Sequence, residues 1–253
     1  MAIVFQMNSN LDNIKAIFFD FDDTLIHVKY AMNTAIYALA ILLSNKFSIS
    51  ILKIMNSLYN IQHTMIKDGV LDRNKWWLRL ASCLNIELSD DLIHKLTETY
   101  WNIIIRYSYV DPETIQILYK LKNCGYILSI ISNTDGNPNI KLKRIQNALP
   151  IDLFNVIIIA GEDTKSLKPS VEPFILALKR LKLNANESIY IGDDIYYDVL
   201  GAKKVGMITI LLQDERITSH SVDNHANINP DFKIRRLNEI LNIIKCEIRL
   251  NHY

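Results

Sequence analysis

Residues 16–24 read AIFFDFDDT: four apolar residues are followed at once by Asp20, Asp22 and Asp23. A short, continuously apolar run is typical of a strand that is buried on both faces, as in a parallel sheet covered by helices on each side. Ligands of such sheets gather at the carboxyl ends of the strands. These acids therefore stand where this kind of fold would place a functional site.

Further apolar, β-branched runs predict more strands at 127–131, 156–160, 188–191 and 207–212. Helical patterns separate them at 111–125 and 171–183; the first begins with Asp111-Pro112, a capping residue followed by a proline that the first helical position tolerates. Strand alternating with helix predicts an α/β fold with a doubly wound, Rossmann-like parallel sheet. We expect a loop over 214–230, a short strand near 232–234 and a closing helix over 237–248.

One segment contains no convincing strand. Between 27 and 109 the sequence shows only helical patterns, at 31–46, 51–66, 73–84 and 92–107. Roughly 80 residues are too many for an ordinary connection between two strands. We therefore predict an α/β core formed by 1–26 and 110–253, and a second, smaller, all-helical domain over 27–109.

The composition is that of a globular protein. Of the 253 residues, 49% are hydrophobic and 22% are charged, and the formal net charge is +1. No global field draws the chain to nucleic acid or to an anionic membrane. Gly-rich dinucleotide and P-loop fingerprints are absent. These features exclude the commonest nucleotide-binding classes and predict neither a nucleic-acid nor a membrane partner.

The chain also lacks signals for export. The longest uncharged apolar run, 35–43, is about half of the roughly 20 residues that cross a bilayer. The N-terminus does not resemble a signal peptide, and Cys83, Cys124 and Cys246 are too few and too scattered for a disulfide framework. We expect a cytoplasmic protein, monomeric or homodimeric.

Polar residues follow the other predicted strands as well: in chain order, Ser132 and Asn133; Lys168; Asp193, Asp194 and Asp198. Each alone is more often a helix cap or a turn residue. Together, so many acids at one sheet edge would repel one another unless a cation lay between them. Carboxylates without sulfur or imidazole partners suit a hard ion, hence Mg²⁺.

Four motifs can be read in order: Asp20-x-Asp22-x-Thr24, Ser132-Asn133, Lys168-Pro169, and Gly192-Asp193 with Asp198 five residues beyond. In order and spacing they resemble the motifs of the haloacid dehalogenase-like (HAD) hydrolase superfamily, in its phosphatase branch. The helical insertion is similar to the α-helical cap of that family. The resemblance also implies that the strand 16–19 lies centrally, between the strands that lead to Ser132 and Asp193.

The resemblance implies a role for each acid. Asp20 would be the nucleophile that forms an aspartyl-phosphate, and Asp22 would protonate the leaving alkoxide and then activate water. Mg²⁺ would be held by the side chains of Asp20 and Asp193 and by the backbone carbonyl of Asp22. An acid at position 22 favours phosphoryl transfer, because a departing halide needs no proton.

The remaining motif residues would serve the phosphate group. The Ser132 hydroxyl and the Asn133 backbone N–H would donate hydrogen bonds to it, and Lys168 would add a positive charge. Asp194 and Asp198 would orient Lys168 or metal-bound water. A structural role is at least as common for both acids, and Asp198 could simply cap a helix.

The expected function is Mg²⁺-dependent hydrolysis of a small phosphorylated metabolite, such as a sugar phosphate or glyceraldehyde 3-phosphate. A phosphomutase, a non-catalytic phospholigand-binding protein and a protein phosphatase or scaffold are the alternatives. Substrate specificity would reside in the helical insertion. Its candidate contacts are Lys67, Arg73, Trp76, Trp77 and Arg79. The more common roles are packing in the core for a tryptophan such as Trp76 and a solvated face for the basic residues.

Overall fold

The computed structural model describes residues 3–4, 11–214, 228–244 and 246. The chain divides into two compact units. We call the first the core unit (Met1–His27, Tyr109–Asn133 and Ala148–Tyr253) and the second the helical unit (Val28–Ser108 and Thr134–Asn147). The sequence analysis assigned 134–147 to the core, whereas the structure includes this segment in the helical unit.

The core unit contains one sheet. Its strands are β1 (Ile3–Val4), β2 (Ala16–Phe19), β3 (Ile127–Asn133), β4 (Phe154–Ala160), β5 (Ser188–Gly192), β6 (Ile208–Leu212) and β7 (Phe232–Ile234). They are ordered β1-β7-β6-β5-β2-β3-β4, and all neighbours are parallel except β1 and β7. The α/β class is confirmed, and each predicted strand is found within two residues of its expected ends.

The first motif follows the central strand. Strand β2 is fully buried and pairs with β3 on one side and β5 on the other, so that Phe19 lies beside Ile130 and Ile191. This confirms the central position that the family resemblance implied. The residues that follow β2, β3 and β5 consequently emerge at the same edge of the sheet.

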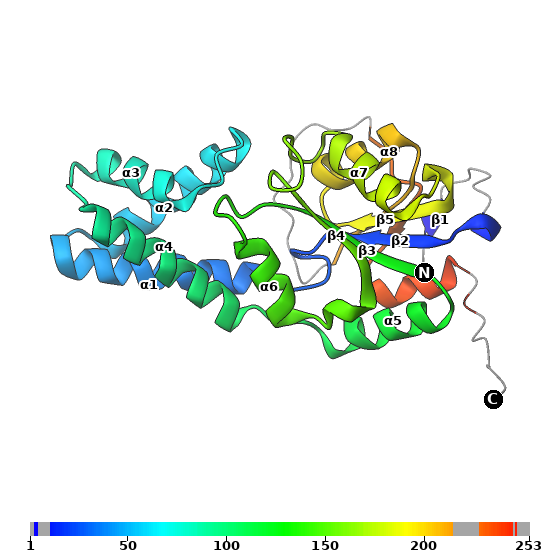
Figure 1. The fold of residues 1–253 in the computed structure, drawn as a ribbon. Helices are drawn as coiled ribbons and strands as arrows, with labels where there is room; N and C mark the ends of the chain where they lie inside the picture. Colours follow the sequence, from blue (N-terminus) through cyan, green and yellow to red (C-terminus); the bar gives the residue numbers. More distant parts are fainter. Residues whose placement is uncertain (1–2, 5–10, 215–227, 245, 247–253) are drawn as a thin grey trace. The chain divides into compact units, whose positions relative to one another are not determined.

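Helices cover both faces of the sheet: α7 and α8 lie on one face, and α5 lies on the other (Figure 1). The helices are α5 (Pro112–Asn123), α7 (Glu172–Leu181) and α8 (Gly201–Val205), with a π-helix η4 (Ile195–Leu200) and short 3₁₀ turns η1 (Leu11–Asn13), η2 (Ile151–Leu153) and η3 (Ala185–Glu187). The predicted cap of α5 is confirmed, because the Asp111 side chain accepts a hydrogen bond from the Glu113 N–H. Beneath α7 the buried rings of Phe174 and Tyr190 meet edge to face.

The C-terminal segment departs from expectation. Strand β7 is confirmed, whereas 215–227, most of the predicted loop, lies outside the described residues. The expected closing helix begins as a 3₁₀ helix, η5 (Leu237–Asn242); positions 245 and 247–248 of that prediction are not described. Leu237 and Ile240 are both buried, and residues three apart align on one edge of a 3₁₀ helix. The structure thus has a 3₁₀ helix over the first part of the expected closing helix.

A disulfide joins Cys124 to Cys246, whose Cα atoms are 5.3 Å apart. The sequence analysis did not anticipate this pairing, because the two cysteines are separated by 122 positions. They meet because η5 packs against α5 and brings Cys246 close to the end of that helix. Among the described cysteines, Cys83 remains free and exposed.

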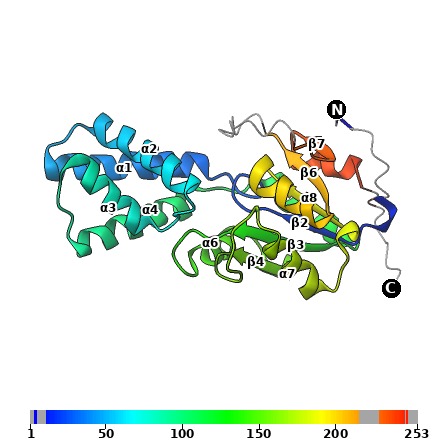
Figure 2. The ribbon, with the colours of Figure 1, turned by 90° about the horizontal axis from the view of Figure 1, so that it is seen from above.

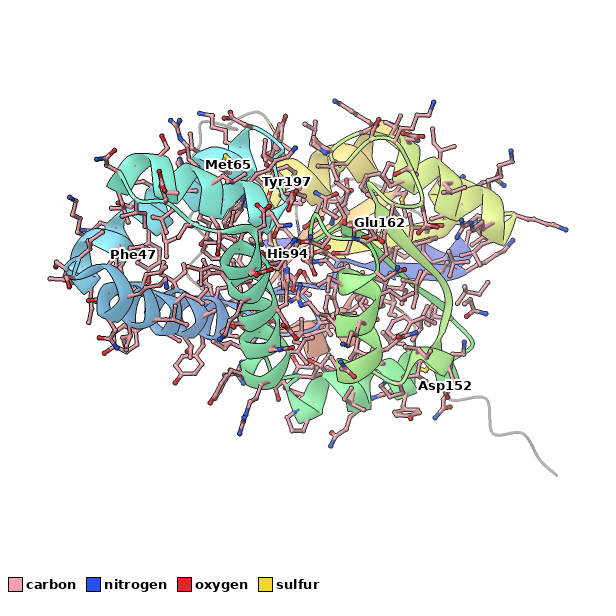
Figure 3. All side chains as sticks on the ribbon, turned by 60° about the vertical axis from the view of Figure 1, so that its left-hand side comes forward. Phe47, Met65, His94, Asp152, Glu162 and Tyr197 are labelled. Atoms are coloured by element: carbon pink, nitrogen blue, oxygen red, sulfur yellow. A yellow bond between two sulfur atoms is a disulfide. The ribbon has the colours of Figure 1, made fainter. Side chains whose placement is uncertain are left out.

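The helical unit consists of α1 (Lys29–Phe47), α2 (Ile51–Lys67), α3 (Arg73–Leu84), α4 (Asp90–Tyr107) and α6 (Ile140–Ala148) without its last residue. Helix α1 packs against α2 and α4, while α3 packs between α2 and α4 (Figure 2). Apolar side chains from these helices form one core, with Phe47 and Met65 packed against it (Figure 3). All four helices predicted in the insertion are confirmed.

The candidate specificity residues of this unit lie in two settings. Trp76 and Trp77 are buried, and their indole N–H groups donate to the Val70 carbonyl and the Thr97 hydroxyl. The buried Arg73 guanidinium lies 3.7 Å from the Trp76 ring centroid. Lys67 and Arg79 are exposed. The aromatic residues thus serve the packing of the unit, which was the more common role.

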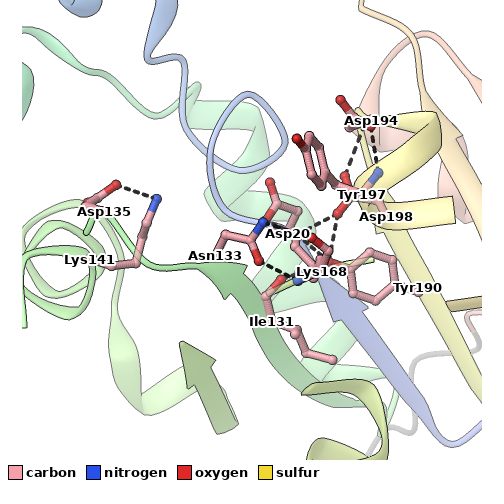
Figure 4. Close-up of polar contacts among 10 residues, drawn as sticks. All are labelled: Asp20, Ile131, Asn133, Asp135, Lys141, Lys168, Tyr190, Asp194, Tyr197 and Asp198. Carbon is pink, nitrogen blue, oxygen red and sulfur yellow. Dashed lines mark hydrogen bonds and ion pairs between the residues drawn. The ribbon is translucent and has the colours of Figure 1, made fainter. Parts of the chain in front are cut away.

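A buried ion-pair cluster anchors α6 within the helical unit. Asp135 lies 2.9 Å from the Lys141 ammonium (Figure 4). It also accepts two hydrogen bonds of 3.0 Å from Arg144. Gly136 between them has a φ of +84°, and a Cβ there would come within 2.2 Å of the Leu71 backbone. Only glycine permits this close approach of the two loops.

Among the described residues, every helix is too short or too polar to cross a lipid bilayer.

Candidate active site

A buried lysine stands at the carboxyl end of the central strand. The Lys168 ammonium donates to Asp20 at 2.7 Å, to Asp198 at 2.6 Å and to the Tyr190 hydroxyl at 3.0 Å (Figure 4). An ammonium group has three N–H donors, so all of them are used. Three of the four sequence motifs therefore meet at one atom.

The two carboxylates keep this lysine charged. Burial alone would lower the pKa of Lys168, but Asp198 and Asp20 raise it well above its ordinary value. In return, the ammonium offsets part of the repulsion between two buried acids. Lys168 is thus a permanent positive charge beside Asp20.

Asn133 holds the loop that carries Lys168. Its side-chain oxygen accepts from the Lys168 backbone N–H at 2.8 Å, and its amide group donates to the Lys168 carbonyl at 3.5 Å. The peptide bond that follows, between Lys168 and Pro169, is cis. Ser132 lies beside Asn133 near the end of β3 and is buried. The side chain of Asn133 therefore has a positioning role that sequence reasoning, which considered only its backbone, did not find.

Asp198 and Asp194 have different tasks. One Asp198 oxygen binds Lys168, and the other accepts from the Asp194 N–H at 3.1 Å. The Asp194 side chain accepts from the N–H groups of Tyr196 and Tyr197 and so caps the π-helix η4. A Cβ at Gly192 would lie 2.2 Å from the Asp198 carboxylate, which explains the glycine there.

Oxygen atoms of Asp20, Asp193 and Asp198 lie within 4.8 Å of one another. Burial raises the pKa of Asp193 well above its ordinary value, and Asp198 and Asp20 raise it further. Such a cluster is stabilised by a divalent cation that prefers oxygen ligands. Because Lys168 and the Asp194 N–H engage both oxygens of Asp198, Asp20 and Asp193 are the side chains best suited to hold the ion. Asp22 lies on the partly exposed turn after Asp20.

This cluster predicts that metal binding stabilises the protein more at alkaline than at acidic pH. In the metal-free protein, burial raises the pKa of Asp198 from 3.8 to about 7, and the pKa of Asp193 is raised as well. An acid whose pKa is raised by folding contributes stability that is present when the pH is below its pKa in the unfolded chain. That stability is lost as the pH rises through its pKa in the folded protein. A cation replaces the missing protons.

We therefore expect millimolar Mg²⁺ to raise the melting temperature more at about pH 8 than at about pH 5.5. Thermal unfolding with Mg²⁺ or with chelator at both pH values measures the difference. Asp193→Asn is the control and should lose most of the rise in melting temperature that Mg²⁺ causes. An equal or larger rise at the lower pH would contradict the assignment of Asp20 and Asp193 as the metal ligands.

Tyr190 is the site residue that the sequence analysis missed. It lies in β5 within the run Ser188-Ile189-Tyr190-Ile191, which was considered only as a strand. A signal was nevertheless present, because a tyrosine in a strand buried on both faces must find a hydrogen-bond partner for its hydroxyl.

Comparison with known proteins agrees with this geometry. A curated glyceraldehyde 3-phosphate phosphatase of Methanocaldococcus jannaschii is 29% identical over 92% of this chain and 97% of that protein. Another protein of that name, from Pyrococcus abyssi, is 30% identical over 78% of this chain and 80% of its own length. A crystal structure of a HAD phosphatase from Thermococcus onnurineus has a TM-score of 0.64 and 28% identity, covering 93% of this chain and 100% of that one.

The family model for haloacid dehalogenase-like hydrolases matches residues 14–206. This range includes all four motifs and the whole set of side chains that meet around Lys168. The chain therefore belongs to the haloacid dehalogenase-like hydrolase family.

Proposed function

We propose that this protein hydrolyses small phosphate monoesters through an aspartyl-phosphate on Asp20. The observation that carries the proposal is the Lys168 ammonium held 2.7 Å from the Asp20 carboxylate, next to Asp193, at the end of the central strand. A carboxylate is a competent nucleophile toward an anionic phosphate only where positive charge screens the approach. The names of the relatives, which are phosphatases, support the same reaction.

The reaction takes two displacements. An Asp20 oxygen attacks phosphorus, the bond from phosphorus to the ester oxygen breaks, and Asp22 gives its proton to the departing alkoxide. Asp22 then takes a proton from a water molecule that attacks phosphorus, and the bond to Asp20 breaks to release inorganic phosphate. A bound Mg²⁺, held by Asp20 and Asp193, supplies the additional positive charge that phosphoryl oxygens require.

The phosphate group needs donors that lie at the strand ends. The Ser132 hydroxyl and the Asn133 backbone N–H are the candidates, since these are the last two residues of β3. Lys168 already uses its three donors on Asp20, Asp198 and Tyr190. It can donate to a phosphoryl oxygen only by exchanging one of these bonds, so its main task is to neutralise and hold Asp20.

The substrate class is that of a small sugar phosphate, with glyceraldehyde 3-phosphate as the first candidate. The names of two relatives, each about 30% identical to this chain, support that choice. We further propose that the helical unit is the cap that encloses the substrate and selects it, and that the protein acts as a monomer or homodimer without nucleic-acid or membrane partners.

Phosphate release from about thirty phosphomonoesters, with Mg²⁺ and with excess chelator, tests the proposal. We expect metal-dependent turnover that is highest for triose or other small sugar phosphates. Isomerisation of a sugar phosphate without net phosphate release would favour a phosphomutase instead. Ligand binding without turnover would favour a binding protein, and turnover of phosphoproteins alone would favour a protein phosphatase.

We also propose that the protein works in the cytoplasm. The Cys124–Cys246 disulfide makes this testable, because disulfides are uncommon in a reducing compartment. Alkylation of thiols in intact cells, followed by mass spectrometry, should find Cys124 and Cys246 reduced and labelled if the compartment is cytoplasmic. Recovery of the intact disulfide would contradict a reducing location.

A further inference from the structure

The Tyr190 hydroxyl is surrounded by three polar groups in the core unit. It accepts from the Lys168 ammonium at 3.0 Å, and it lies within donating distance of the Ile131 carbonyl at 2.8 Å and of Asp198 at 3.1 Å. The side chain is 1% exposed. A hydroxyl has one proton, and here two acceptors share it.

These contacts connect separate strands. Tyr190 belongs to β5 and Ile131 to β3, and the central strand β2 lies between them. The hydroxyl thus reaches across β2 to the residue that precedes Ser132 (Figure 4). Through Lys168 it is also tied to the loop after β4. One oxygen atom links the ends of the strands that carry three motifs.

We propose that Tyr190 is a positioning residue, which fixes the Lys168 ammonium against Asp20 by a hydrogen-bond network that spans β3, β2 and β5. This inference rests on the proposed function, since it explains how the nucleophile and its counter-charge are held. Tyr190 itself is buried beneath the site and takes no part in bond making. Its ring is already placed by the edge-to-face contact with Phe174, at a centroid distance of 5.0 Å.

The physical reason is that a lysine side chain is long and flexible. Four rotatable bonds precede its ammonium group. Two carboxylates alone would allow the ammonium to move between Asp20 and Asp198. A third acceptor defines the position of the ammonium, because its three donors then point to three fixed oxygens. A small displacement of an aligned charge lowers a catalysed rate strongly.

Tyr190→Phe removes the hydroxyl and keeps the ring. We expect kcat for the best ester to fall by about tenfold, the scale of one hydrogen bond to a charged group, with KM nearly unchanged. Tyr100→Phe is the matched control. Its hydroxyl is also buried but has no hydrogen-bond partner among the residues that the structure describes, and we expect kcat to stay as in the wild type.

A crystal structure of Tyr190→Phe provides a readout that does not depend on activity. We expect the Lys168 ammonium to leave hydrogen-bond distance of Asp20, while the fold and the Phe174 contact persist. An ammonium that stays 2.7 Å from Asp20 overturns the proposal, whatever the rate. An unchanged kcat in an active enzyme overturns it as well.

The two proposals can fail separately. If no ester is hydrolysed by the wild-type protein, the proposed function fails, and the position of the ammonium in the variant still decides the role of Tyr190. If the esters are hydrolysed and Tyr190→Phe behaves like Tyr100→Phe, only the positioning role is refuted.

Discussion

Replacing Asp20 with asparagine is expected to abolish phosphate release, with kcat reduced by about 10⁴-fold or more. The amide cannot form the acyl phosphate that the carboxylate forms, so the first displacement has no nucleophile. The amide oxygen can still accept the hydrogen bond of Lys168, so the fold should survive. Stopped assays of phosphate release and a thermal melt of the same preparation provide the measurement.

Asp23→Asn is the matched control for this variant. Asp23 lies in the same acidic turn but has a φ of +54°, a conformation that asparagine adopts as readily as aspartate. The Asp23→Asn variant should retain most of the activity of the wild-type protein. Equal losses in the two variants, or substantial activity in Asp20→Asn, would remove Asp20 from the nucleophilic role.

Lys168→Met is expected to have the second largest effect, on both activity and stability. It leaves Asp20 and Asp198 buried without the cation that lies 2.7 Å and 2.6 Å from them. Loss of one partner from a buried charge cluster costs about 3–5 kcal/mol of unfolding free energy. We also expect kcat to fall about 10³-fold, because the counter-charge beside Asp20 is gone. Denaturant unfolding at neutral pH and steady-state kinetics measure the two effects.

A double variant separates these effects. Adding Asp198→Asn to Lys168→Met removes one of the two buried acids that have lost their cation, so part of the lost stability should return. Activity should stay low, because Asp20 still lacks its ammonium. If the double variant is less stable than Lys168→Met alone, the electrostatic explanation is wrong and packing around the lysine stem must account for the loss.

Much of the fold could be predicted from local patterns. The runs at 16–19 and 188–191 are apolar because both faces of those strands are covered, and each was found as a strand. Asp111 was predicted to cap a helix, and its side chain accepts a hydrogen bond from the first turn of α5. Burial on a regular element and the capping of a helix end depend on neighbours within a few positions, so the sequence displays them directly.

The candidate site could be predicted only as a set of residue types. Their spacing after successive strands indicated that Asp20, Lys168 and Asp193 face one edge of a parallel sheet. The spacing did not reveal that the Asn133 side chain holds the backbone of Lys168 or that Asp194 caps η4. These contacts depend on side-chain directions, which follow from how loops from different strands fold over one another.

Three features became visible only in the folded chain: the Tyr190 network across β2, the Cys124–Cys246 disulfide, and the association of 134–147 with the helical unit. Each joins segments that lie tens of positions or more apart. The amino-acid sequence alone indicated the strands, the helices, the order of the motifs and the chemistry of their side chains, because burial and charge are properties of each residue and its near neighbours. Which distant oxygen completes the shell around Lys168 follows from the strand order and register of the sheet, and these arise only when the whole chain packs.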